Sequence, residues 1–202
     1  MPRHQAFENF GNIPEVFLLL DPAVCRNQSR AGSPTFKHVS VSELLGAFEA
    51  DSESFTGRQH MEWWNSIARL SPRERKQLLR DGALDEPAMV LEHRGIPKLQ
   101  RPIELARTTW AIGKIGAGER PPWPAIWRGL AEKSLAILTK FNAQDISNTA
   151  HAFAAVGHAS PALFDAVAEE AVARGLREFK PQELSNTVWA FGTAGHASPA
   201  LF

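Results

Sequence analysis

The most constraining feature of this chain is an internal repeat. Segments 141–164 and 179–202 begin 38 residues apart, and both end in Gly-His-Ala-Ser-Pro-Ala-Leu-Phe. A repeat of this length is typical of stacked helical hairpins, because a single hairpin cannot bury its apolar face without a neighbour. The repeat therefore predicts an all-α fold, specifically a right-handed α-solenoid of helix-turn-helix hairpins of about 38 residues each.

Weaker copies of the repeat precede the clear ones. Residues 102–113 resemble residues 181–192, and a still weaker copy starts near Phe55. Because the last copy stops where its second helix should begin, we expect a truncated sequence; the alternative is a natural end capped by oligomerisation. The predicted parts are an irregular leader at 1–36 and a helical repeat domain at 37–202, with degenerate copies at about 55–98 and 100–140 and clear copies at 141–178 and 179–202.

Each unit carries start and stop signals for two helices. The first helix opens with Pro or Ala, followed two residues later by an acid that faces the free N–H groups of the first turn. A glycine then stands where the chain must leave the helix in a left-handed conformation. Ser160-Pro161 is expected to cap and start the second helix. The opening residues are Pro102, Ala143 and Pro181, the acids are Glu104, Asp145 and Glu183, and the glycines are Gly116, Gly157 and Gly195.

Apolar spacing predicts which helix faces are buried. Leu184, Val188 and Phe191 recur at helical intervals and should form one buried stripe on the first helix. The second helix should turn Leu163, Phe164, Val167 and Val172 inward.

Upstream of the clear repeats, capping boxes mark further helices. Ser40–Glu43 and Ser71–Glu74 both fit this pattern, in which a serine and a glutamate three residues later satisfy free N–H groups. We predict a helix over 57–70 between them. Another helix should span 86–93, with Gly95 beyond its end.

Composition excludes several classes of site. With Cys25 as its one cysteine, the chain cannot form an internal disulfide or a multi-cysteine zinc site. We find no membrane-spanning run, catalytic triad, phosphate-binding glycine loop or paired-histidine metal motif. We therefore predict a protein without catalytic residues, metal or cofactor. His158 and His196 recur in the turn between the two helices, where a structural hydrogen bond is the favoured interpretation.

Two positions vary while the repeat frame around them stays constant. Trp110, His151 and Trp189 are equivalent, and Arg107, Asn148 and Asn186 stand three residues before them. A planar ring with a hydrogen-bonding group in each repeat is what single-stranded RNA recognition requires. The alternative is structural, with the ring packed on the next hairpin and the polar group holding a loop.

Charge is unevenly distributed, although the 22 basic and 22 acidic residues balance overall. Residues 141–202 contain three basic and six acidic side chains. Phosphate contacts need Lys or Arg, so RNA contacts by this chain should lie upstream; the alternative is a solvated face of mixed charge. The upstream basic residues are Arg73, Arg75, Lys76, Arg80, Arg101, Arg107, Lys114, Arg120 and Arg128.

The repeat motif in residues 179–202 resembles the roughly 38-residue hairpins of organellar RNA-metabolism proteins. These are the octotricopeptide and heptatricopeptide repeats, the FAST-kinase-like proteins, and a domain named after a subunit of the mitochondrial RNA-editing substrate-binding complex. The resemblance covers about residues 39–202. It implies a mitochondrial or plastid protein that binds single-stranded RNA of an organellar transcript, or other proteins of an RNA-processing complex. The implied role is in RNA processing, stability or translation, and the alternative is a protein–protein interaction scaffold.

Overall fold

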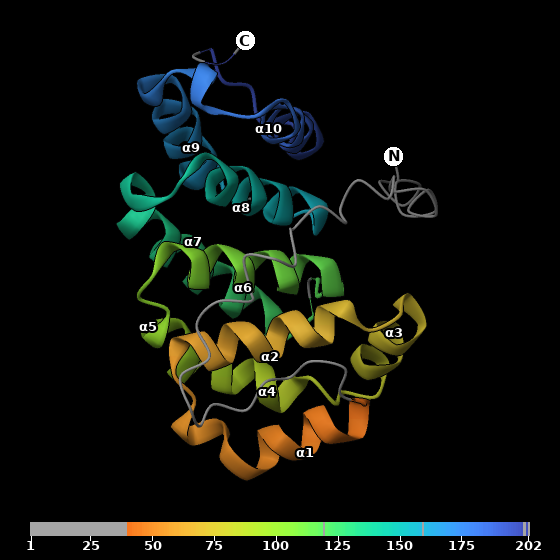
Figure 1. Ribbon diagram of the computed structural model, residues 1–202. Helices are drawn as coiled ribbons and strands as arrows, with labels where there is room; N and C mark the ends of the chain where they lie inside the picture. The colour runs from red at the N-terminus through yellow and green to blue at the C-terminus, as the bar shows by residue number, and fades with distance from the viewer. Residues whose placement is uncertain (1–39, 119, 159, 200, 202) are drawn as a thin grey trace. The chain divides into compact units, whose positions relative to one another are not determined.

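The computed structural model describes residues 40–202, apart from positions 119, 159, 200 and 202. The described residues form helices joined by turns, and no strand occurs among them (Figure 1). The all-α prediction is thereby confirmed. The leader predicted at 1–36, which includes Cys25, lies outside the described residues.

The helices follow one another closely along the chain. The α-helices are α1 (Val41–Asp51), α2 (Gly57–Arg69), α3 (Pro72–Arg80), α4 (Asp85–Val90), α5 (Ile96–Lys98), α6 (Pro102–Ile115), α7 (Trp123–Ile137), α8 (Ala143–Ala155), α9 (Pro161–Arg174) and α10 (Pro181–Ala194). Short 3₁₀ segments are η3 (Ser52–Ser54), η5 (Leu138–Lys140) and η6 (Leu176–Glu178), and η4 (Leu91–Gly95) is a π-helical turn.

The first helices of successive hairpins lie side by side in the order α2, α6, α8 and α10 (Figure 1). The most extensive contacts between helices join α2 with α6, α6 with α8, and α8 with α10. Helices α7 and α9 pack against α6 and α8 respectively, and also against each other. Helices α6, α8 and α10 therefore carry equivalent positions of the repeat on neighbouring elements.

Two of the predicted helix signals, the acid in the first turn and the glycine at the end, are confirmed in the first helices of three hairpins, α6, α8 and α10. The acids Glu104, Asp145 and Glu183 each accept a hydrogen bond from the backbone N–H three residues earlier. The three predicted glycines all have positive φ, of 80°, 69° and 62° in chain order. Both upstream capping boxes also form. Predictions from these signals are correct because each signal depends on residues within a few positions of one another.

Aromatic side chains dominate the core. Four tryptophans from α2 and α7 are at most 1% exposed, and the ring of Trp64 meets those of Trp63 and Trp123 edge to face. A phenylalanine that precedes three of the first helices is buried each time, as Phe55, Phe141 and Phe179. The buried tryptophans are Trp63, Trp64, Trp123 and Trp127.

Four local predictions are wrong. Val188 is 52% exposed and Val172 43% exposed, although both were expected inside. Helix α10 packs chiefly on α8, so helical spacing alone misjudged which of its faces is covered. Ser160 precedes α9, but its side chain makes no capping hydrogen bond. Gly95 does not lie beyond a helix end, because the π-helical turn carries the chain directly into α5.

Small residues allow α6 and α8 to approach closely. A Cβ atom at Gly113 would lie 2.9 Å from the Cβ of Ala152 and 3.0 Å from its Cα. The Gly113→Ala change should therefore push the two helices apart and lower the free energy of unfolding by about 1–3 kcal/mol. Urea denaturation measures this effect.

The matched control is Gly192→Ala, at the equivalent position of α10. Nothing lies within 4 Å of a Cβ atom there. Without a clash, the higher helix propensity of alanine should stabilise the protein by roughly 0.5–1 kcal/mol. Equal effects of the two changes would contradict a close approach at Gly113.

Candidate nucleic-acid interface

The predicted site residues occupy matching places on three neighbouring helices. Arg107, Asn148 and Asn186 are the sixth residues of α6, α8 and α10, and Trp110, His151 and Trp189 are the ninth residues. Because these helices lie side by side, the six residues follow one face across the hairpins. We call these six residues the helix row.

Helix α2 also has residues at the positions equivalent to those of the helix row. Its sixth and ninth residues are Glu62 and Asn65. The amide nitrogen of Asn65 donates to the carbonyl of Met61 at 2.8 Å and lies 3.4 Å from the carbonyl of Arg107 on α6. Sequence reasoning missed these two residues, although the weak copy starting at Phe55 places them in register.

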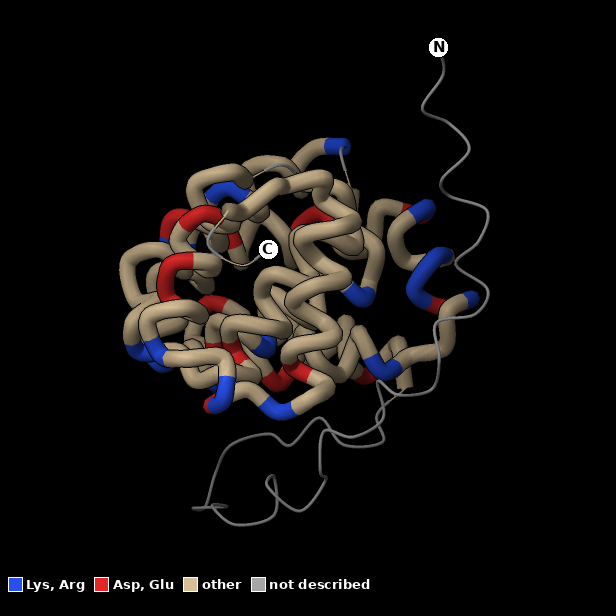
Figure 2. Tube along the Cα trace, turned by 90° about the horizontal axis from the view of Figure 1, so that it is seen from above, with Lys and Arg blue, Asp and Glu red and all other residues tan. Residues whose placement is uncertain are grey.

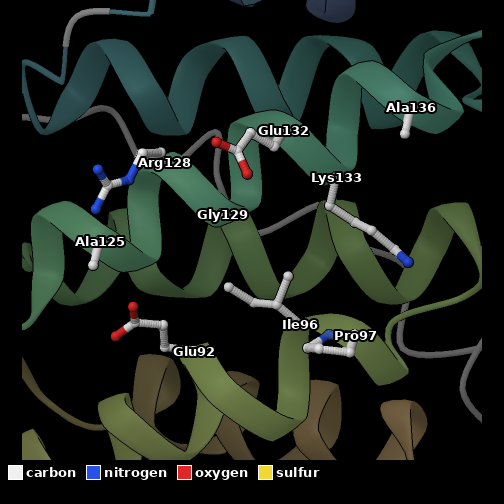
Figure 3. Close-up of a pocket in the computed structure, with 9 residues that line it drawn as sticks. All are labelled: Glu92, Ile96, Pro97, Ala125, Arg128, Gly129, Glu132, Lys133 and Ala136. Atoms are coloured by element: carbon white, nitrogen blue, oxygen red, sulfur yellow. The ribbon is translucent and has the colours of Figure 1, made fainter.

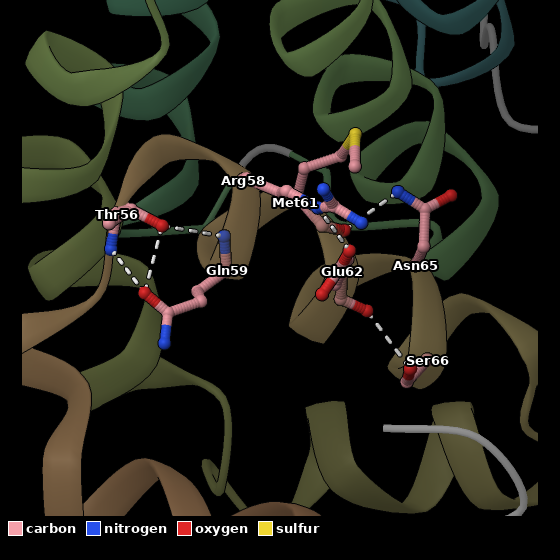
Figure 4. A network of polar contacts seen from close by, with 7 residues as sticks. All are labelled: Thr56, Arg58, Gln59, Met61, Glu62, Asn65 and Ser66. Carbon is pink, nitrogen blue, oxygen red and sulfur yellow. Dashed lines mark hydrogen bonds and ion pairs between the residues drawn. The ribbon is translucent and has the colours of Figure 1, made fainter. Parts of the chain in front are cut away.

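Polar contacts link residues along α2, as Figure 4 shows. Arg58 forms an ion pair with Glu62 at 2.8 Å, one turn along the helix. Thr56 and Gln59 close the capping box at the start of the helix. The carboxylate of Glu62 is thus paired with a cation of its own helix.

Trp110 is only 8% exposed, so the fold uses most of its ring surface. The Nζ atom of Lys114 lies 4.8 Å from the centre of the ring, a cation–π contact one turn along α6. The geometry of Trp110 therefore fits the structural alternative, in which the ring packs within the fold, better than a role in stacking an RNA base.

His151 and Trp189 stack on each other across α8 and α10. Their ring centres lie 4.4 Å apart, with 22° between the ring planes. Burial lowers the pKa of His151 to about 4, so its imidazole is neutral at pH 7. Trp189 remains 41% exposed despite this contact. The row therefore contains a preformed aromatic stack with an accessible indole.

The polar members of the row are partly exposed. Asn186 accepts a hydrogen bond from Gln182 at 2.9 Å, which orients its amide on α10. Arg107 acts electrostatically on Asp145 of the next hairpin. Burial raises the pKa of Asp145, and the hydrogen bond from Asn142 and the charge of Arg107 oppose that rise.

Positive charge gathers where α2, α3 and α6 meet. Arg69 lies in the last turn of α2, Arg75 in α3, and Lys114 in the last turn of α6. Burial lowers the pKa of Lys114, and the charges of Arg75 and Arg69 lower it further. Figure 2, which marks Lys and Arg in blue and Asp and Glu in red, shows charges of both signs spread over the described chain.

A shallow pocket lies away from the helix row, between α7 and the segment formed by η4 and α5 (Figure 3). Ile96 and Pro97 line it together with two basic and two acidic side chains. The charged groups are Arg128 and Lys133, with Glu92 and Glu132. Their ends do not converge on one point in Figure 3, so the pocket has no focused charge for a ligand.

The two recurring turn histidines contact the aromatic core of their hairpins. The ring of His158 lies 6.1 Å from Trp127, and that of His196 lies 5.6 Å from Phe164. His196 also makes a 2.8 Å side-chain hydrogen bond with Asp165. The predicted structural role is confirmed for His196 by this bond.

Within the described part of the chain, no group of three or more His, Cys, Asp or Glu side chains is arranged to hold a metal ion. None of the helices described there is long and apolar enough to cross a membrane. Comparison with protein-family models, curated proteins and solved structures finds no match.

Proposed function

We propose that this chain is a non-catalytic RNA-binding protein built as a right-handed α-solenoid of hairpin repeats. The helix row would hold single-stranded RNA, with the bases along α8 and α10. Following the sequence resemblance, the RNA would be an organellar transcript in a mitochondrion or plastid, and the role would be in its processing, stability or translation.

One observation carries this proposal: polar and ring-bearing residues stand at the same two positions of three neighbouring helices, and two of the rings, His151 and Trp189, stack on each other. An extended strand of RNA presents a base at regular intervals, so a repeating protein surface suits it. Trp189 supplies an accessible ring, and Asn148 and Asn186 supply amides that donate and accept hydrogen bonds. Base-to-indole stacking contributes about 1–3 kcal/mol per base.

Titration of a fluorescently labelled single-stranded RNA tests the proposal. Wild-type protein should bind more tightly at about 50 mM than at about 200 mM salt, because phosphate contacts release counterions. Trp189→Ala should weaken binding at least fivefold, since roughly 1–3 kcal/mol of stacking is lost.

Val188→Ala is the matched control. Val188 is 52% exposed on the same helix but offers no ring for stacking, so binding should be unchanged. Circular dichroism checks that both variants remain helical. Absence of binding at low salt, or equal affinity of Trp189→Ala and wild type, would refute the proposed RNA face.

A protein–protein interaction scaffold is the second candidate, and the surface of α10 favours it. Val188 and Trp189 expose apolar surface side by side, while residues 141–202 contain three basic and six acidic residues. Such a face suits a partly basic protein partner better than phosphate. A chain that binds no RNA at low salt, yet loses a co-purifying protein partner on Trp189→Ala, would be a scaffold.

A further inference from the structure

We propose that Arg69, Arg75 and Lys114 form a phosphate-binding site at one end of the helix row. The site would take a backbone phosphate of bound RNA, and in this respect it rests on the proposed function. The site consists of three cations, each from a different helix.

Arg75 is fixed in place by the end of α2. One of its guanidinium nitrogens donates to the backbone carbonyls of Ala68 and Leu70. These carbonyls belong to the helix end, where they have no partner within the helix. The guanidinium is therefore pre-positioned, and an anion bound there would not have to order a free side chain.

Lys114 is positioned by a different contact, with the ring of Trp110. Its Nζ atom lies 4.8 Å over the ring of Trp110, and that ring is itself 8% exposed and therefore fixed by packing. Among the described residues, neither Lys114 nor Arg69 forms an ion pair. The charges that act on Lys114 come from Arg69 and Arg75, and both are positive.

Helix dipoles explain part of this arrangement, since Arg69 and Lys114 stand in last turns where cations are favoured. They do not explain why Arg75 binds the backbone that flanks Arg69 while its charge also acts on Lys114, because like charges repel. An anion removes that repulsion, and a phosphate group accepts hydrogen bonds from several such donors at once.

The location fits the rest of the row. Trp110 belongs to the row and lies directly beneath Lys114, so a phosphate at this site would adjoin the residues proposed to meet the bases. The α8 and α10 hairpins have an excess of acids. The cation site would thus supply the phosphate attraction that those hairpins lack.

The test compares two double variants with equal loss of charge. Arg69→Gln/Lys114→Gln removes the site, while Arg128→Gln/Lys133→Gln removes two cations that line the pocket against α7. Arg75 is kept because it satisfies carbonyls of α2. Two probes are used: inorganic tripolyphosphate, followed by thermal unfolding, and labelled single-stranded RNA, titrated over a range of salt concentrations.

Tripolyphosphate should raise the melting temperature of wild type and of the control, but not of the Arg69→Gln/Lys114→Gln variant. For RNA, the variant should bind roughly tenfold more weakly at low salt, and its slope of log affinity against log salt should fall by about 1.4, for two phosphate contacts. The control should keep the wild-type slope.

The possible outcomes distinguish a failure of the phosphate-binding site from a failure of the proposed RNA-binding function. Tripolyphosphate stabilisation that disappears in the variant, without RNA binding to any form, would support the site and refute the RNA function. RNA binding with the same slope in wild type and variant would overturn the site and leave the RNA function standing. Equal losses in the two double variants would reveal a general charge effect and also overturn the site.

Discussion

Trp127→Ala should lower the free energy of unfolding by about 3–5 kcal/mol, because it removes a large fully enclosed side chain. Trp127 is 1% exposed and meets the ring of Phe153 on α8 edge to face, with centres 4.9 Å apart. Its indole nitrogen donates to the carbonyl of Ala117 at 2.9 Å. The side chain therefore joins the turn after α6, helix α7 and the next hairpin.

Urea or thermal unfolding followed by circular dichroism measures this loss. Trp127→Phe should be much milder, at about 1 kcal/mol, because it keeps an aromatic ring and gives up one hydrogen bond. The next hairpin supports this substitution, since Phe164 fills the matching position and is 2% exposed. Trp189→Ala is the exposed control, and a loss as large as that of Trp127→Ala would contradict the argument from burial.

Acidification should destabilise the protein between about pH 6.5 and pH 4 through His60. This imidazole is 1% exposed, and burial together with the charge of Lys98 lowers its pKa to about 4. In the unfolded chain its pKa returns to about 6.5. The unfolded state therefore binds the proton first as the pH falls, and stability decreases through this window.

The difference between the two pKa values corresponds to a loss on the order of 3 kcal/mol once His60 is protonated in the folded state. Among the described residues, neither ring nitrogen has a hydrogen-bond partner that would compensate for the charge. His151, with its pKa also lowered to about 4, should add to the loss in the same direction.

Urea denaturation at pH 7 and at pH 4.5 measures the effect. His60→Leu should reduce the difference in stability between the two pH values, because an apolar side chain cannot take up a proton in the core. His93→Leu is the matched control, since it removes a histidine that is exposed on η4 instead of one in the core. If His60→Leu and wild type lose the same stability on acidification, the burial of a neutral His60 is not the cause.

The candidate site was partly predictable, because the repeat itself supplies the register. Aligning Arg107 with Asn148 and Asn186 needs only the spacing of the copies, and the structure has them at the same place in successive helices. The group of three cations could not be predicted in the same way. Arg69, Arg75 and Lys114 come from three helices, and no short-range pattern relates residues so far apart in the chain.

Trp110 and Trp189 show most clearly that burial could not be predicted from the sequence. They occupy the same position of the repeat, yet one is 8% exposed and the other 41% exposed. Burial depends on what packs against a helix, so identical residues in similar local sequence differ once their neighbours differ. The same reason explains the exposure of Val188, which was predicted to be buried from its spacing alone.

The sequence by itself determined the helical class, the capped helix starts, the glycine turns and the equivalence of positions, because caps and turns act over a few residues. Only the tertiary structure decided which rings are covered, which ring His151 stacks on, and where three like charges meet. Those properties arise between helices that are distant in sequence, where packing and electrostatics are set by neighbours that no local pattern specifies.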